Sequence, residues 1–233
     1  FNPIILILNK RSMKKFILLT ILTICFSNAQ SIRTYNFVAD TDDASIIGEV
    51  FNDFHGKYKK KSGGVILQRV RFLNDVTHRV LYYGDPENWG MKEKVPQEAW
   101  SNYINRMRIH RNPGKGSYTA KSMYWKGGDR EKYNVGRQWL FKAKDPSKYA
   151  AAYVKFAKAI EPIIGERMMG VGKIEMGDLN GATHYTVFYG ENMQDLDIMA
   201  DKIRASKAYQ EFVKTNGGSE ILVSYMVRDL IRL

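Results

Sequence analysis

Apolar positions along the first half of the chain switch between helical spacing and the alternation typical of strands. Helical spacing covers residues 46–58 and 100–107, and strand-like segments cover residues 35–39, 65–72, 76–83 and 117–125. Asp42 or Asp43 is expected to cap the first helix, because a carboxylate accepts hydrogen bonds from free N–H groups at a helix start. The pattern therefore predicts the order strand, helix, strand, strand, helix, strand.

The second half repeats this order with clearer boundaries. Asp145-Pro146 supplies a cap and a first-turn proline for one helix, and Asn216-Gly217-Gly218 ends the other. The predicted helices cover residues 149–160 and 196–213, and the predicted strands cover residues 138–143, 168–176, 183–189 and 220–228.

One predicted hairpin occurs twice in the sequence. Residues 73–84 return as residues 179–190 with six identical positions, among them the pair Thr-His that ends in His78 and His184. Asn180-Gly181 predicts a tight two-residue turn, because both positions of such a turn need positive φ. The repeat indicates one structural unit present in two copies.

The fold class predicted from this order is α+β: two tandem ferredoxin-like βαββαβ repeats whose antiparallel sheets pack face to face as an intrachain α+β barrel. The predicted boundaries are residues 30–127 and 128–233, after a separate segment 1–29. Both repeats lie on one polypeptide, so we expect a monomer that is an intrachain pseudo-dimer.

On this element order and internal repeat, the chain resembles the dimeric α+β barrel superfamily across residues 31–232. That superfamily includes antibiotic-biosynthesis-monooxygenase-like and stress-responsive barrel proteins, and the chlorite dismutase relatives have the tandem form. The first group implies a pocket between sheet and helices, lined by aromatic side chains. The second implies a haem with an axial histidine in the second half. No motif assigns His184 to that role, so no cofactor is predicted and haem is not favoured.

The turn at Asn180-Gly181 would pair Gly177 with His184 and Glu175 with Thr186. These side chains then share one face, which we expect to look into the space between the two sheets, while Tyr185 faces the helices. The same counting places Arg69 and His78 on the inner face of the first half. Arg69 would lie opposite Glu175 and could form an ion pair with it.

The start of the chain has the features of a secretory signal. Met13-Lys14-Lys15 precedes an apolar run from Phe16 to Phe26, and Ser27-Asn28-Ala29 suits cleavage after Ala29. Eleven apolar residues are too few to span a bilayer, which needs roughly 20. The protein is therefore expected to be periplasmic or extracellular, with no stable membrane span after cleavage.

Cleavage would change the composition of the chain. It removes the single cysteine, Cys25, and with it any disulfide, thiolate catalysis or cysteine-ligated metal site. The formal net charge is +12, and part of it lies in the removed segment. The remaining basic surface is expected to be solvated, and an exported protein rarely meets nucleic acid, so no nucleic-acid partner is predicted.

Candidate chemistry centres on the repeated histidines. His78 and His184 can act as acids or bases near neutral pH, and Tyr185 follows one of them. No set of residues has metal-ligand spacing. The candidate ligand-binding residues are Trp139, Tyr153 and Tyr225 as aromatic walls, Trp89 in the insert 85–95, and the Arg69 and Glu175 pair.

Three functions remain open. The first is binding of a small hydrophobic or aromatic ligand. The second is a cofactor-independent monooxygenase or cyclase with an acid-base site of histidine and tyrosine. The third is an envelope interaction module that uses the basic patch following the insert, formed by Arg106, Arg108, His110, Arg111 and Lys115.

Overall fold

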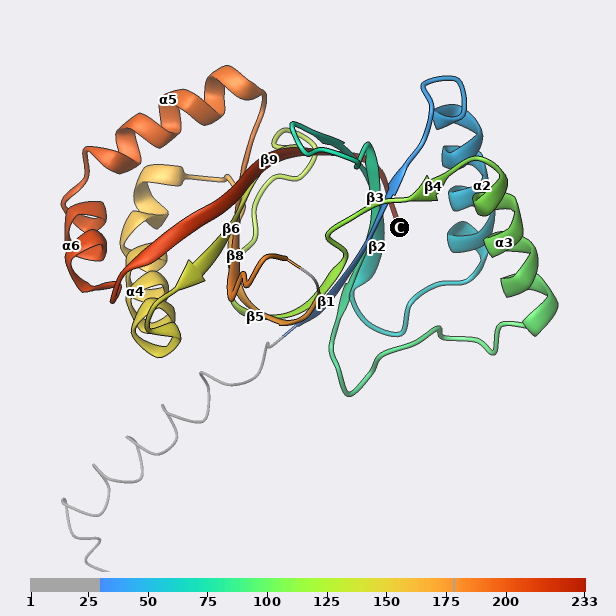
Figure 1. Cartoon of the computed structure of the whole chain (residues 1–233), viewed down its shortest axis with the longest axis horizontal. Coiled ribbons are helices and arrows are strands. Elements are labelled where there is room, and N and C mark those ends of the chain that lie inside the picture. Colours follow the sequence, from blue (N-terminus) through green and yellow to red (C-terminus); the bar gives the residue numbers. More distant parts are fainter. Residues whose placement is uncertain (1–29, 178) are drawn as a thin grey trace, which may run out of the picture.

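The computed structural model describes residues 30–177 and 179–233, and within them a central β-barrel carries helices on two opposite sides (Figure 1). The strands of the first half are β1 (Ser31–Val38), β2 (Gly64–Arg71), β3 (His78–Gly84), the short β4 (Asn112–Pro113) and β5 (Tyr118–Lys126). Those of the second half are β6 (Val135–Ala143), β7 (Met169–Met176), β8 (His184–Gly190) and β9 (Ser219–Arg232).

The helices lie outside the barrel. α2 (Ala44–Lys57) and α3 (Gln97–Ile109) cover the first half, and α4 (Pro146–Ile164), α5 (Met193–Arg204) and α6 (Lys207–Thr215) cover the second. Among the helices of the described residues, none is both long and apolar enough to cross a membrane.

Eight antiparallel strands close the barrel. The sheet order is β3-β2-β9-β6-β8-β7-β5-β1, and β1 also pairs with β3, which completes the circle. Within each half the first strand lies between the third and the last, as in a ferredoxin-like unit. The two halves are joined where β9 pairs with β2 and β5 pairs with β7. The predicted α+β fold class is confirmed.

The helix starts follow the predicted caps in only one of two places. Asp145 accepts a hydrogen bond from the Lys148 backbone N–H at 3.0 Å and begins α4, as expected. Asp43 precedes α2 without a side-chain cap, because its carboxylate binds His110 Nδ1 at 2.8 Å instead.

The helix predicted over residues 196–213 is two helices. Ser206 separates α5 from α6, and its Oγ accepts a hydrogen bond from the Tyr209 backbone N–H at 3.1 Å. Serine competes with a continuous helix by offering this local bond, so the segment turns and caps a new helix. α6 then packs against α4, with Phe212 stacked on Phe156 at 4.9 Å between ring centroids.

The predicted register of the second hairpin is wrong. The turn itself forms, with positive φ at Asn180 and Gly181 and a hydrogen bond from Ala182 N–H to the Leu179 carbonyl. The ladder, however, pairs His184 with Lys173 rather than with Gly177. β7 leaves β8 before the turn because its end pairs with β5, where Met176 lies opposite Thr119.

The predicted faces are also reversed. Arg79, Tyr185 and Tyr189 point into the barrel, whereas His78 and His184 lie on the helix side. The register differs from the predicted one by four residues, an even number, so side chains that were predicted to share a face still share it. What changes is which of the two faces lines the barrel interior. The apolar inner core contains buried side chains from every barrel strand except β3 and β7, and partly buried Leu81, Tyr83 and Ile174 complete it from those two.

Candidate functional site

A cavity of about 590 Å³ lies between the outer face of the first-half sheet and α3. β1 and β3 form its floor, α3 forms one wall, and the insert 85–95 forms another. The lining residues used below are Arg33, Tyr35, Phe37, Lys60, Tyr82, Trp89, Trp100, Tyr103 and Arg111.

The insert is held in place by the segment that follows α2. The Lys61 backbone N–H donates to the Gly90 carbonyl at 3.0 Å, and the Lys92 N–H donates to the Lys59 carbonyl at 2.8 Å. Ser62 Oγ accepts from the Asp85 N–H at 2.9 Å. These bonds fix a loop that would otherwise be free, and they bring Trp89 to the cavity wall.

The Trp89 ring contacts two cations. The guanidinium of Arg33 is 4.4 Å and the ammonium of Lys60 is 4.6 Å from the centre of its ring. Lys60 is also 5.2 Å from the Tyr82 ring. Cations over an aromatic face are attracted by its quadrupole, so the tryptophan positions both charges at the cavity.

The positive charges at the cavity have no carboxylate partners. Arg33, Lys60 and Arg111 form no ion pair within residues 30–177 and 179–233, and the described cavity lining holds no acidic side chain. Burial lowers the pKa of Lys60, and the charge of Arg33 lowers it further. An anion in the cavity would relieve this repulsion.

A hydrogen-bonded tyrosine and histidine lie at the floor. Tyr82 OH and His55 Nε2 are 3.2 Å apart. Burial lowers the pKa of His55 to about 3, and the charges of Lys60 and Lys59 act in the same direction. Burial also raises the pKa of Tyr82 and brings that of Tyr103 to about 12. At neutral pH this group is therefore uncharged, and it offers hydroxyl protons.

The predicted catalytic histidines lie elsewhere. His184 is 1% exposed beneath Tyr149 of α4, and His78 stacks on Phe37. Burial lowers the pKa of each to about 4, aided by Lys173 beside His184 and by Arg69 beside His78. Neither histidine lines the cavity beside Trp89, the cavity inside the barrel or either of two further surface cavities.

The predicted aromatic pocket of the second half is not formed. Trp139 and Tyr153 belong to the packed cluster between sheet and helices, while Tyr185 and Tyr225 lie inside the barrel. The two pairs are on opposite faces of the sheet and cannot line one pocket. Trp89 does line a cavity, but in the first half.

Arg69 and Glu175 are both exposed, and no ion pair joins them among the described residues. The expectation that they meet between the sheets is wrong, because both lie on outer faces.

The basic patch is largely neutralised by nearby carboxylates. Three of its members have acidic partners, and Arg111 turns toward the cavity, where it lies 5.5 Å above the Phe37 ring. The three pairs are Arg106 with Asp53, His110 with Asp43, and Lys115 with Asp75.

The space that would hold a haem in the second half is filled by side chains. Tyr149, Phe156 and Ile160 of α4 are buried against the sheet, and Phe212 of α6 packs over them. The Tyr149 ring lies 4.9 Å from the His184 ring between centroids and covers this histidine. Among the described residues there is also no cluster of three potential metal ligands. The residues present do not fit a haem.

Sequence reasoning found Trp89 because the insert interrupts the repeat. It missed Arg33, Lys60 and Tyr82, which come from three separate segments. The only sequence signal was the change at one repeat position, where Tyr82 matches Phe188 of the second half.

Neither protein-family models nor curated proteins match the sequence. Solved structures do match it. A putative monooxygenase from Lactobacillus acidophilus NCFM superposes with a TM-score of 0.60 at 12% identity, over 88% of this chain and 94% of that chain. A mutant chlorite dismutase from Candidatus Nitrospira defluvii in complex with cyanide gives 0.54 at 13% identity, over 90% and 94%.

A heme-binding protein from Thermus thermophilus gives a TM-score of 0.50 at 8% identity, over 87% of this chain and 92% of that chain. At such identities the likeness shows the fold alone. The chain therefore shares the α+β barrel fold of monooxygenase-like and chlorite dismutase-like proteins.

Proposed function

We propose that the protein binds a small aromatic or apolar ligand that carries an anionic group, in the cavity beside Trp89. The observation that carries this proposal is a cavity of about 590 Å³ with aromatic walls and three unpaired cations within the described residues. Ligand cavities commonly measure about 300–1,000 Å³ and combine apolar walls with a few polar groups.

The walls favour a flat ring. Trp89, Trp100, Tyr103 and Tyr35 present aromatic faces or edges to the cavity, and Tyr35 is half-exposed at its mouth. Aromatic pairs are worth about 0.5–1.5 kcal/mol beyond the area that they bury. A ligand of one or two fused rings would therefore gain both burial and stacking.

The cations select an acidic substituent on that ring. Arg33 and Lys60 both lie against the Trp89 ring, and Arg111 lies over the Phe37 ring. A carboxylate, sulfonate or phenolate between them would accept charge-assisted hydrogen bonds. Burial and the charge of Arg33 both depress the Lys60 pKa, so an anion bound beside Lys60 should raise that pKa and take up protons at alkaline pH.

A second candidate function is turnover of the same ligand without a cofactor. Tyr82 lines the cavity, and its bond to His55 gives a hydroxyl paired with an imidazole. The pKa directions keep both groups uncharged at neutral pH and make Tyr82 a weak acid and His55 a weak base, so the pair could protonate only a strongly basic bound anion. Some proteins of similar fold are named as monooxygenases, which agrees with this candidate at the level of fold.

Export is a further part of the proposal. It rests on the basic and apolar segment before Ser27-Asn28-Ala29. Residues 1–29 lie outside the described part of the chain. Mass spectrometry after cell fractionation should find the protein in the periplasm as a chain that begins at Gln30, and a chain found only in the cytoplasm with Met13 retained would contradict export.

Calorimetric titration with a matched pair of ligands tests the binding proposal. We expect 2-naphthoate to bind and neutral 2-naphthalenemethanol to bind roughly tenfold more weakly, because the alcohol leaves the cations unpaired. Lys60→Gln should remove most of that difference. Trp89→Leu should weaken both ligands because both use the ring.

Lys202→Gln is the matched control, since it removes an exposed lysine on α5 far from the cavity. It should leave both affinities unchanged. Equal affinity of the two ligands in the wild type, or binding that survives Trp89→Leu unchanged, would overturn the proposal.

A further inference from the structure

The interior of the barrel holds a buried arginine. Arg79 of β3 is 1% exposed, and its guanidinium is held by neutral groups. Nε donates to Gln68 Oε1 at 2.5 Å, and Nη1 donates to Gln138 Oε1 at 2.8 Å and to Tyr225 OH at 3.1 Å. Burying an ion costs several kcal/mol unless its charge is compensated, so this site needs an explanation beyond packing.

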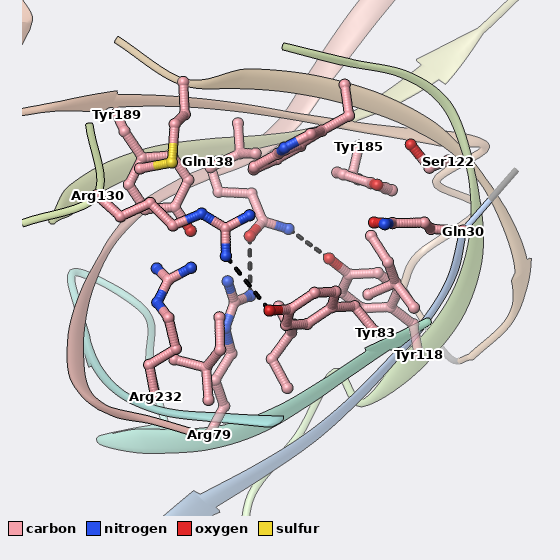
Figure 2. A pocket seen from close by; sticks show the side chains of 16 residues that line it. Gln30, Arg79, Tyr83, Tyr118, Ser122, Arg130, Gln138, Tyr185, Tyr189 and Arg232 are labelled. Atoms are coloured by element: carbon pink, nitrogen blue, oxygen red, sulfur yellow. Dashed lines mark hydrogen bonds between the residues drawn. The ribbon is translucent and has the colours of Figure 1, made fainter. Parts of the chain in front are cut away.

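Nearby charges leave a positive excess. Figure 2 shows the guanidinium groups of Arg79, Arg130 and Arg232 pointing toward one another. Among the described residues only Asp229 brings a carboxylate to this group, and it is bonded to Gln68 Nε2 and Arg232 rather than to Arg79. Three guanidinium groups therefore share one carboxylate.

Three tyrosine hydroxyls around the cavity accept hydrogen bonds from neighbouring side chains. Gln138 Nε2 donates to Tyr118 OH at 2.5 Å, and Gln68 Nε2 donates to Tyr189 OH at 3.3 Å. Arg130 donates to Tyr83 OH at 3.3 Å. Each of these hydroxyls already accepts a bond, so its own O–H remains to be donated.

One hydroxyl is left without a partner. Tyr185 is 2% exposed, and its OH makes no hydrogen bond in the described part of the chain. It lies beside Ser122 at the edge of a cavity of about 50 Å³ that Arg79, Arg130 and Arg232 also line (Figure 2). Such a volume holds about three to five water-sized groups, at about 10–15 Å³ each.

We propose that this cavity inside the barrel is a binding site for a small monovalent anion, of the size of chloride or formate. The anion would lie against the free side of the Arg79 guanidinium and accept hydrogen bonds from the phenol hydroxyls. It would balance the excess positive charge and use the donors that the protein does not satisfy by itself. This site is separate from the cavity beside Trp89, because the two lie on opposite faces of β3.

The probe is chloride, followed by the excess line width of its ³⁵Cl NMR signal in the presence of the purified protein. We expect excess broadening that saturates and that formate displaces. Tyr185→Phe deletes one donor and keeps the ring, so it should weaken binding roughly tenfold. Arg130→Gln at the half-buried edge should weaken it as well, and neither change should prevent folding.

Lys202→Gln is the control, because it removes an exposed lysine on α5, away from both cavities, and should leave the broadening unchanged. Lys60→Gln reports any chloride that is held at the cavity beside Trp89. A displacement by formate but not by the larger sulfate supports a small monovalent site. The inference fails if the broadening is absent, or if Lys60→Gln abolishes it while Tyr185→Phe leaves it intact. Naphthoate titrations of the same variants are independent of this outcome, so the two sites can fail separately.

Discussion

The space between sheet and helices is hollow in the first half and filled in the second. Beside β1 and β3 it forms a cavity of about 590 Å³. Beside β6 and β8 the equivalent layer is packed by Tyr149, Phe156 and Phe212. The two halves therefore have the same element order, but among the described residues only the first has a cavity of this size between its sheet and its helices.

The cause of the difference lies in two segments outside the repeat. The second half has α6, which places Phe212 against α4. The first half has the insert 85–95, which is tied to the chain after α2 and brings Trp89 to the cavity. Helix α6 fills the layer between sheet and helices in the second half, whereas the insert forms one wall of the cavity in the first half.

The repeated Thr-His pair is the same in both halves in spite of this difference. Thr77 Oγ1 accepts from the Ala39 N–H at 2.8 Å, and Thr183 Oγ1 accepts from the Ala143 N–H at 3.0 Å. Each threonine is also 2.9 Å from Nδ1 of the histidine that follows it. The repeat thus ties the hairpin to the end of the first strand in each half. It is structural, and function is more readily assigned to the segments that differ.

The largest expected effect comes from truncating one aromatic side chain in each layer. Phe156→Ala should lower the free energy of unfolding by about 3–5 kcal/mol, because the ring is 7% exposed and its loss leaves a closed void. Trp100→Ala should cost less than about 2 kcal/mol, because that ring is 36% exposed and already borders open space. Urea unfolding of both variants measures the contrast.

Lys158→Ala on the exposed surface of α4 controls for the loss of side chain from that helix. Similar costs for the two aromatic truncations would show that the first-half layer is as tightly packed as the second, and would remove the contrast between the halves.

The next effect is a loss of stability in acid that both halves share. The pKa of His78 and of His184 is about 4 in the fold, below the usual 6.5. Protonation therefore favours the unfolded chain, and stability present above pH 6.5 is lost as the pH falls toward 4. Each histidine should contribute on the order of 2 to 3 kcal/mol to this loss.

Urea unfolding between pH 7.5 and 4 should show a shallower pH dependence for His78→Gln and for His184→Gln, by similar amounts. Subtracting the pH dependence of each variant from that of the wild type leaves the contribution of the replaced histidine, because the carboxylates and His55 contribute to both. An unchanged slope in only one variant would show that the two repeated histidines are not equivalent.

The element order and the barrel followed from the sequence because periodicity reports which side of each element is buried. The inner face did not follow, because every residue of β8 from His184 to Gly190 is buried. When both faces of a strand are covered, alternation no longer separates inside from outside. Arg79 adds to the ambiguity, because a charged side chain is rarely buried, yet this one lies inside the barrel.

The hairpin register was wrong for a different reason. A turn at Asn180-Gly181 fixes only its own hydrogen bond, and the pairing of β7 with β5 decides the rest. The cavity was only partly predictable for a similar reason. Trp89 stands out in an insert, but Arg33 and Lys60 are brought to it by strand pairing and by the loop after α2.

The smallest effect tests whether the repeated hairpin has one structural role in both halves. Thr77→Val and Thr183→Val should each lower the free energy of unfolding by about 1 to 2 kcal/mol, because each leaves the N–H of Ala39 or Ala143 without its acceptor. Thr→Ser at the same positions keeps the hydroxyl and should cost less. Naphthoate affinity should be unchanged in Thr183→Val, since the second half has no part in the cavity. A loss of affinity in that variant would instead couple the filled half to the hollow one, and the division of roles between them would no longer hold.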